Sequence, residues 1–494
     1  MNMHPVAFGV TVPAYNTTPP FHPATRFPEL PFSEISVAPN WPYELLRQLF
    51  LNLGMDRERF GTKDWNPLGG VIQPGQTVVL KPNYVLSFND SGQDLFAVIT
   101  HPSILRALVD YAYIALKGQG RIVIADVPQM DCDWDELMRA QRLDAIQDFY
   151  WSKFRFKIEA YDLRNFAVID HRKAPLTENR KKLPGDPAGS VIINLGKQSH
   201  FYGLPNQNYY GADFNRQETI AHHNGETHEY CVSKTILSAD VFLSVPKMKT
   251  HKKVGVTLNL KGLVGINTNK NYLIHYRLGT PKNGGDQLPD AQPGADRALV
   301  KVQRWAYDRF LAQQSKTADA VYQTGVKIYR RTVKPFLRIS KDTQTVDAGN
   351  WHGNDSAWRM TADLAKILFF GDATGKMHAT PRRRMFCVVD GIVAGDKLGP
   401  LEPDPRRCGC LVAGAHPFAV DQVTTRLMGF DPRKLHQFDP LGEGAWDFGL
   451  KTLGEIEVRT GDRRFSGDDF FSATQRDPYF GFTPHPGWKG QVEV

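Results

Sequence analysis

The sequence predicts an α/β fold: a mostly parallel sheet with flanking helices, plus a helical insertion. Three consecutive segments predict it, because 77–80 is a buried apolar run, 101–118 has apolar residues at helical spacing, and 120–128 is a second buried run. A strand, a helix and a strand in close succession form a βαβ unit, which makes the two strands parallel. We expect further strands within 190–196 and 239–250.

These elements form a core in two parts, with additions at three places. An N-terminal arm rich in proline and aromatic residues (1–70) is expected to be irregular, and the core then runs through 71–292. The pattern of 293–345 is helical with a basic end, which predicts an insertion. The second part of the core (346–440) holds two more strands and a helix, within RMFCVVDGI and GCLVAGAHPFAVDQVTTRLMGF. A C-terminal tail (441–494) follows.

Composition and charge limit the classes of function. Of the 494 residues, 41% are hydrophobic and 23% are charged, which is ordinary for a soluble globular protein. The net charge of +8 favours an anionic small molecule and is too weak to indicate nucleic acid binding. No apolar run approaches the roughly 18 residues of a membrane span, and the N-terminus lacks a signal-peptide pattern. The five scattered cysteines match no zinc or iron–sulfur motif, so we expect a cytoplasmic protein without an iron–sulfur cluster.

One stretch, residues 241–285, contains eight lysines and arginines and no acidic residue. Like charges held close together repel one another unless an anion lies among them. Pro246 breaks the predicted strand, so Lys247, Lys249 and His251 follow its carboxyl end, where open α/β sheets bind ligands. We therefore expect this lysine-rich segment to bind an anion, although a solvated basic loop would also explain its composition.

The candidate catalytic residues are His251, Lys249 and Lys261. His251 is the natural acid or base near neutral pH, and clustered lysines lower one another's pKa, which prepares one of them as a base or nucleophile. Gly255 lets the chain turn, so we expect His251 and Lys261 to face one pocket. Other polar and basic side chains are candidates for binding the substrate: Lys81, Asn83, Lys247, Thr257, Asn259, Lys270, His275 and Asn354.

Three aspartates are candidate ligands of a divalent cation such as Mg²⁺. Asp286 follows a Gly-Gly turn, Asp355 precedes a predicted helix, and Asp390 follows a buried strand. Carboxylate oxygens are the ligands that hard cations prefer. Two alternatives remain open, because a Gly-Gly-Asp sequence is often only a turn and Asp355 is also a suitable helix N-cap. The three histidines of AHHNGETHEY (221–230) lie in a polar segment, which favours a surface position over a zinc site.

The lysine-rich segment also carries a resemblance. VPKMKTHKKVGVTLNLKGLVGIN closely resembles the motif of the bacterial family called domain of unknown function 362, and LKPN, THP, DGIVAGDKLGP and GAHPFAVDQVTTRLMGF extend the resemblance over roughly residues 75–435. GINTNKNYLIHYRLGTPKNGGD and GNWHGND are similar to the subgroup found among genes for envelope polysaccharide assembly, which implies a role in polysaccharide biosynthesis. Many relatives carry a ferredoxin-type domain, but this chain lacks its cysteines.

A more distant similarity links the segment to the N-terminal domain of nickel-pincer lactate racemases and implies a shared fold. His251, Gly255, Thr257 and Lys261 have the spacing of a racemase motif whose lysine anchors the cofactor and whose histidine acts as acid or base. The Gly-Gly-Arg that precedes the racemase lysine is absent here, as is the racemase Asp-x-Thr-Arg motif. A nickel-pincer nucleotide is therefore not expected.

Two functions from different classes remain open. The first is an enzyme that acts on a phosphorylated or nucleotide-linked substrate through a Lys/His/Asp site. The second is a non-catalytic, anion-binding accessory protein of a membrane glycan-assembly system. The basic run 326–341 favours peripheral contact with an anionic membrane surface, although Pro335 interrupts it. Neither the reaction class nor the oligomeric state follows from the sequence.

Overall fold

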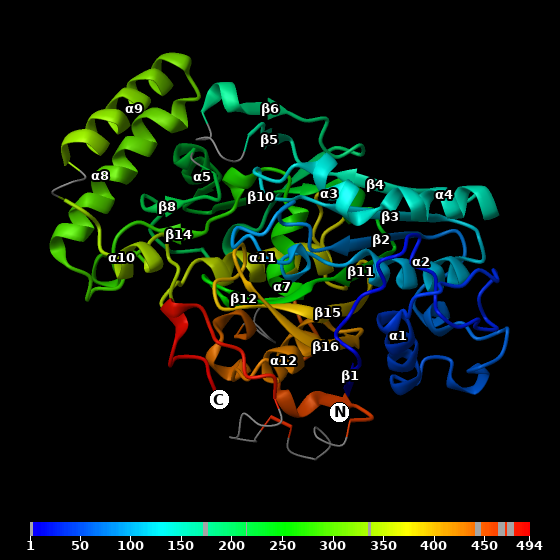
Figure 1. The fold of residues 1–494 in the computed structure, drawn as a ribbon. Coiled ribbons are helices and arrows are strands. Elements are labelled where there is room, and N and C mark those ends of the chain that lie inside the picture. Colours follow the sequence, from blue (N-terminus) through cyan, green and yellow to red (C-terminus); the bar gives the residue numbers. More distant parts are fainter. Residues whose placement is uncertain are drawn as a thin grey trace.

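A computed structural model describes residues 3–170, 176–213, 215–333, 337–439, 446–462, 470–471 and 479–494. A 10-stranded sheet forms its centre (Figure 1). The strands of this sheet are β1 (His4–Val10), β2 (Thr77–Pro82), β3 (Arg121–Asp126), β4 (Ile158–Asp162), β11 (Val241–Val245), β12 (Lys247–His251), β13 (Gly255–Thr257), β15 (Arg384–Asp396), β16 (Asp404–Gly414) and β17 (Ile456–Arg459). Their order is β17-β1-β16-β15-β11-β2-β3-β4, and β12 pairs with both β15 and β13.

The sheet is mainly parallel, as the βαβ pattern predicts. Strands β15, β11, β2, β3 and β4 run parallel to one another, while β16 is antiparallel to both β15 and β1. The long strand β15 pairs with β11 along its first half and with β12 along its second half. The α/β fold class is therefore confirmed.

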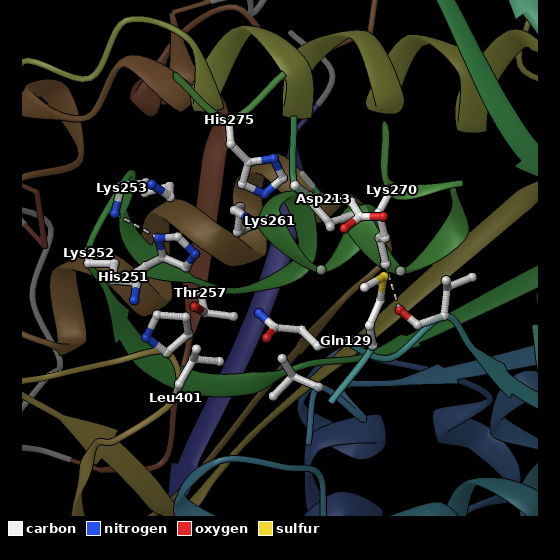
Figure 2. Close-up of a pocket in the computed structure, with 18 of the residues that line it drawn as sticks. Gln129, Asp213, His251, Lys252, Lys253, Thr257, Lys261, Lys270, His275 and Leu401 are labelled. Atoms are coloured by element: carbon white, nitrogen blue, oxygen red, sulfur yellow. Dashed lines mark hydrogen bonds between the residues drawn. The ribbon is translucent and has the colours of Figure 1, made fainter. Parts of the chain in front are cut away.

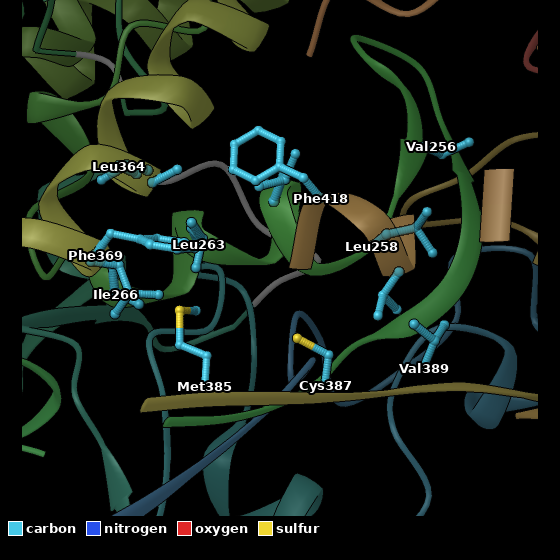
Figure 3. Packing of buried hydrophobic residues seen from close by; sticks show 14 of the residues in the cluster. Val256, Leu258, Leu263, Ile266, Leu364, Phe369, Met385, Cys387, Val389 and Phe418 are labelled. Carbon is cyan, nitrogen blue, oxygen red and sulfur yellow. The ribbon is translucent and has the colours of Figure 1, made fainter. Parts of the chain in front are cut away.

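Helices cover both faces of the sheet because its strands are apolar on both sides. Along β2, Val79 belongs to one hydrophobic core, whereas Val78 and Leu80 belong to the other. The second core is built with α1 (Trp41–Asn52), α2 (Pro102–Leu116), α3 (Trp134–Gln141) and α4 (Leu143–Phe154). The first core is built with α6 (Lys234–Leu237), α7 (Asn259–Gly262), α11 (Ala357–Phe370) and α12 (Pro417–Leu427). Figure 3 shows apolar side chains of α11 and α12, such as Phe369 and Phe418, gathered over strand β15.

Smaller sheets lie beside the central one. The predicted strand at 190–196 forms as β7 (Ser190–Asn194), but it pairs with β10 (Thr227–Ser233), which also pairs with β9 (His223–Asn224). Two further pairs are β5 (Phe166–Val168) with β6 (Arg180–Lys182) and β8 (Tyr209–Tyr210) with β14 (Tyr276–Arg277). The short helix α5 (Arg216–His222) precedes β9.

The helical insertion consists of α8 (Gly294–Phe310), α9 (Lys316–Ile328) and α10 (Lys341–Val346). Helices α8 and α9 stand at the edge of the molecule, away from α1 and α4 (Figure 1). Within the predicted basic run, residues 334–336 lie outside the described residues. Among the helices described, none is long and apolar enough to cross a membrane.

The two ends of the chain differ from the prediction. The N-terminal arm is not irregular throughout, because β1 is an internal strand of the central sheet and α1 packs into a core. The C-terminal tail supplies β17, which pairs parallel to β1. The strand pattern of β1 covers only seven residues and contains a proline, so the sequence alone gives a weak signal for it.

Candidate functional site

A cavity of about 520 Å³ opens where the parallel strands β2, β3 and β11 end. Carboxyl ends of parallel strands meet at one edge of a sheet, and ligands bind there in open α/β folds. Its described lining is strongly basic (Figure 2). The charged and imidazole side chains that line it are Lys81, Lys249, Lys252, Lys253, Lys261, Lys270, Arg304, His251, His275, Asp126, Asp131 and Asp213.

The turn after β12 brings His251 and Lys261 to this cavity. His251 pairs with Gly255 in the β12–β13 hairpin, where Gly255 has a φ of 83° that favours glycine. The chain then enters α7, whose first N–H groups, on Asn259 and Leu260, each donate to Asp421 over 2.9 Å. This short helix returns Lys261 to the lining that His251 shares, as the spacing predicts. The catalytic roles of both residues stay predictions.

Lys261 is the more deeply buried of two lysines of the lining, with Lys252, that have no side-chain partner among the described residues. Its side chain is only 8% exposed, and it makes no hydrogen bond or ion pair with any residue that the structure describes. Burial, followed by the nearby charge of Lys81, lowers its pKa from 10.5 to about 7. A substantial fraction of Lys261 is therefore a neutral amine at neutral pH.

Two histidines face the cavity in different tautomers. The Nδ1 atom of His251 accepts the N–H of Lys253 over 2.9 Å, so the neutral ring carries its proton on Nε2. The Nδ1 atom of His275 donates to the carbonyl of Leu273 over 3.0 Å, which leaves Nε2 as a free acceptor. Burial, followed by the charge of Lys261, holds the pKa of both rings well below 6.5. The His275 ring is therefore unprotonated at neutral pH.

Three other lysines of the lining, Lys249, Lys253 and Lys270, donate to backbone carbonyl groups. Lys249 Nζ donates to the carbonyls of Val98 and Pro400 over 2.7 and 3.1 Å. Lys270 Nζ donates to the carbonyl of Val127 over 3.0 Å, and burial lowers its pKa to about 7. A carbonyl orients an ammonium group without cancelling its charge, so these contacts leave the cavity available to an anion.

Lys81 differs from these lysines because it also forms an ion pair, with Asp126 over 2.8 Å. Gly265 lies against this pair, and a Cβ atom there would overlap both the Asp126 carboxylate and the Lys81 ammonium. The position therefore requires glycine. The candidates Asn83 and Thr257 also line the cavity.

Three predicted substrate-binding residues lie outside the described lining. Lys247 is fully buried and pairs with Asp390 over 2.5 Å. Asn259 donates its side-chain amide to Asp421 over 2.6 Å. Asn354 caps the start of α11 through its Oδ1 atom and donates Nδ2 to the carbonyl of His275 over 3.1 Å. All three hold the fold around the cavity.

The three predicted metal ligands do not form one group. Asp286 and Asp355 both contact Arg277, and the N–H of Asp355 donates to Asp286. Asp390 instead pairs with Lys247, because β12 and β15 are hydrogen-bonded neighbours. Among the residues that the structure describes, no cluster of three or more His, Cys, Asp or Glu side chains is arranged to hold a metal ion. The metal-binding roles of the three aspartates, and a bound divalent cation, stay predictions.

Other residues depart from the sequence-based assignment. Within 221–230, His223 and His228 are buried against Phe201 and not exposed as the polar pattern suggested. The sequence analysis also missed Arg304 and Asp126 of the cavity lining. Asp126 ends a predicted strand, which was a usable signal, whereas Arg304 on α8 enters the site only through tertiary packing.

Comparisons with known proteins give a partial match to one family model and a weak structural similarity. The model of the family described as Domain of unknown function (DUF362) matches residues 185–426. No curated protein matches the chain. A crystal structure of a Thermotoga maritima protein, solved as a structural genomics target, aligns with 77% of this chain at 11% identity and a TM-score of 0.30. The alignment spans 58% of that protein's length.

Proposed function

We propose that this chain, which carries a DUF362 domain over residues 185–426, is an enzyme acting on a phosphorylated or nucleotide-linked substrate. One observation carries the proposal: seven lysine and arginine side chains and only three carboxylates line the described part of one cavity. Two of those carboxylates, Asp126 and Asp213, already pair with Lys81 and Arg180. An anion bound among the remaining cations would relieve their mutual repulsion.

A catalytic role is supported by the protonation states around Lys261. Its amine has a pKa of about 7, and His275 presents an unprotonated Nε2 in the same cavity. Lys261 gains and loses a proton near neutral pH, which suits general acid–base catalysis. A merely binding site would gain from lysines that stay fully charged.

The proposed biological setting is polysaccharide biosynthesis in the cytoplasm. The resemblance to a subgroup linked to envelope polysaccharide assembly supports a sugar-containing substrate of that biosynthesis. All five cysteines are free, which fits the proposed cytoplasmic location. A Mg²⁺ ion brought in with substrate phosphates would fit the usual binding of this cation, with few protein ligands.

Calorimetry with inorganic phosphate, pyrophosphate and a sugar nucleotide tests the proposal directly. We expect saturable binding and a higher melting temperature, because a ligand that binds only the folded state stabilises it. The variant Lys261→Met should weaken binding. The control Lys282→Met changes an exposed lysine of the same acid-free stretch and should bind as the wild type does. Equal binding by both variants would contradict the proposal.

The accessory-protein alternative also has a specific observation in its favour. The helical insertion exposes large apolar side chains, among them Val302 (63%), Trp305 (60%) and Ile328 (58%). Lys327 and Arg330, both exposed, lie beside Ile328. Apolar and basic side chains together on exposed helices suit peripheral binding to an anionic membrane.

Vesicle sedimentation distinguishes this membrane contact from the catalytic proposal. The chain should sediment with vesicles containing phosphatidylglycerol and not with pure phosphatidylcholine, since anionic lipid attracts the basic residues. Trp305→Ser should reduce sedimentation. Trp151→Ser is the matched control, because Trp151 is exposed to 54% on α4, far from the insertion in Figure 1. Equal sedimentation of both variants would remove the insertion as the contact.

A further inference from the structure

We propose that Lys261 is a nucleophile that forms an imine with the carbonyl carbon of a phosphate-bearing aldehyde or ketone. The inference rests on the anionic-substrate function proposed above and adds a reaction to it. The proposed reaction includes a covalent intermediate between Lys261 and the substrate. It also narrows the substrate class to carbonyl compounds.

The position of Lys261 distinguishes it from its neighbours. Its side chain is more than nine-tenths buried, yet it lines the cavity and has no hydrogen-bond or ion-pair partner within the described chain. Lys249 and Lys270 each donate to backbone carbonyls. Among the described lysines of the lining, Lys261 therefore combines deep burial and access to a bound ligand with a nitrogen that no described group orients elsewhere. Lys252 also lacks such a side-chain partner, but it is more exposed.

Its protonation state supports the same role. A lysine attacks a carbonyl only as the neutral amine. With a pKa of about 7, half of Lys261 is neutral near pH 7, whereas roughly one in 3,000 lysines of ordinary pKa is neutral there. Burial, which excludes water around the ammonium form, is the main cause of this shift.

The cavity also offers a place for the phosphate. Its volume of about 520 Å³ falls in the usual range for small-molecule sites, about 300–1,000 Å³. Lys270, Lys249 and Arg304 line the same space, and Figure 2 shows Lys270 and Lys253 on opposite sides of Lys261. A phosphate held by these cations would leave a carbonyl group within reach of the Lys261 amine.

His275 supplies the proton transfers that the reaction needs. The Lys261 nitrogen forms a bond to the carbonyl carbon, and the C=O π electrons move to oxygen. His275 Nε2 carries one proton from the nitrogen to that oxygen, which becomes the hydroxyl group of a carbinolamine. His275 then carries the second nitrogen proton to the hydroxyl, which leaves as water while the nitrogen lone pair completes the C=N bond. Lys261 is the charge that most lowers the pKa of His275, which indicates that the two groups are near neighbours.

Pyridoxal 5′-phosphate is the probe, because it carries both an aldehyde and a phosphate. The intact protein is incubated with it, the imine is fixed with sodium borohydride, and modified lysines are located by peptide mass spectrometry. Pyridoxal, which lacks the phosphate, is the matched probe. Lys261→Met is the test variant, and Lys282→Met, at an exposed position, is the control.

We expect Lys261 to be labelled about a hundred-fold faster than Lys282 near pH 7, because its neutral fraction is so much larger. Its labelling rate should level off above about pH 8, whereas that of Lys282 should keep rising toward pH 10. Sulfate should slow labelling of Lys261 by pyridoxal 5′-phosphate. Lys261 should still be labelled in the Lys282→Met variant. In the Lys261→Met variant, the cavity should carry no label.

Labelling of Lys261 no faster than that of Lys282, or preferential labelling of Lys249 or Lys270, would overturn the inference. Wild-type mapping alone gives this answer, so the result does not depend on whether a variant folds. Phosphate binding without Lys261 labelling would overturn the imine and leave the anionic-substrate function standing. Equal labelling of Lys261 by pyridoxal would contradict the anionic-substrate function while keeping Lys261 as the nucleophile.

Discussion

Lys247 and Lys261 come from the same acid-free stretch and are both buried, but their ammonium groups have opposite surroundings. Lys247 lies between Asp390 and the Tyr15 hydroxyl, at 2.5 and 2.9 Å, with a further contact to the carbonyl of Val393. Lys261 has none of these contacts and lines a cavity. A buried charge is tolerated when a counter-charge accompanies it. Lys247 therefore serves the fold, and Lys261 is left for a ligand.

The largest expected effect comes from breaking the Lys247 pair. Lys247→Met should lower the free energy of unfolding by about 3–5 kcal/mol, because it leaves the Asp390 carboxylate buried without a counter-charge. Urea unfolding followed by circular dichroism measures this change. The double variant Lys247→Met, Asp390→Asn should recover part of the loss. A double variant as unstable as the sum of the two single variants would argue against a coupled pair.

Removing the charge of Lys261 should instead raise the free energy of unfolding. Its folded-state pKa, about 7, lies below the unfolded-state value near 10.5, so the unfolded chain binds more protons between these values and wild-type stability rises with pH across that window. Lys261→Met should be more stable than the wild type below pH 7, and the difference should vanish toward pH 10.5. Unfolding curves measured at several pH values test this. Parallel curves for the two proteins would show that Lys261 carries no burial cost.

Anion affinity should fall as the cavity lysines lose their protons. Burial lowers the pKa of Lys261 and Lys270 to about 7, so sulfate should bind about ten-fold more weakly near pH 8.5 than near pH 6. Sulfate is the suitable probe because its own charge is constant over this range. Calorimetry on Lys261→Met should show a shallower pH dependence. A wild-type affinity independent of pH would exclude these two lysines from the binding site.

The smallest effect is expected at Lys282, an exposed lysine of the same stretch. Lys282→Met should change the free energy of unfolding by less than about 0.5 kcal/mol, because an exposed side chain is equally hydrated in both states. It should also leave sulfate affinity unchanged. A larger effect on either measurement would mean that the acid-free stretch acts through its total charge and not through the placement of individual lysines.

The sequence predicted the fold class because its signals are local. The buried runs that became β2 and β3, and the amphipathic segment that became α2, each carry their pattern within fewer than twenty residues. Parallel pairing then follows from the order strand, helix, strand. Strand β1 was not predicted, because its seven residues pair with strands about 400 residues away in the chain. A local sequence pattern gives no information on such distant partners.

The place of the site was also within reach of the sequence. A lysine run after a strand that ends in proline predicts a binding site at the carboxyl edge of the sheet, and the cavity lies there. Gly255 and the ten-residue spacing indicated that His251 and Lys261 share one space, and both line it. The prediction of a binding site depended on the eight lysines and arginines, without any acidic residue, in residues 241–285.

Only the tertiary structure decided which lysine does what. Lys247 and Lys249 are two residues apart on β12, and nothing in their sequence context tells that one meets Asp390 on the neighbouring strand while the other meets backbone carbonyls. The same holds for Arg304, which reaches the cavity from a helix of the insertion. Pairing, burial and the resulting pKa depend on groups distant in the chain, because electrostatic energy is set by distance in space and by excluded water.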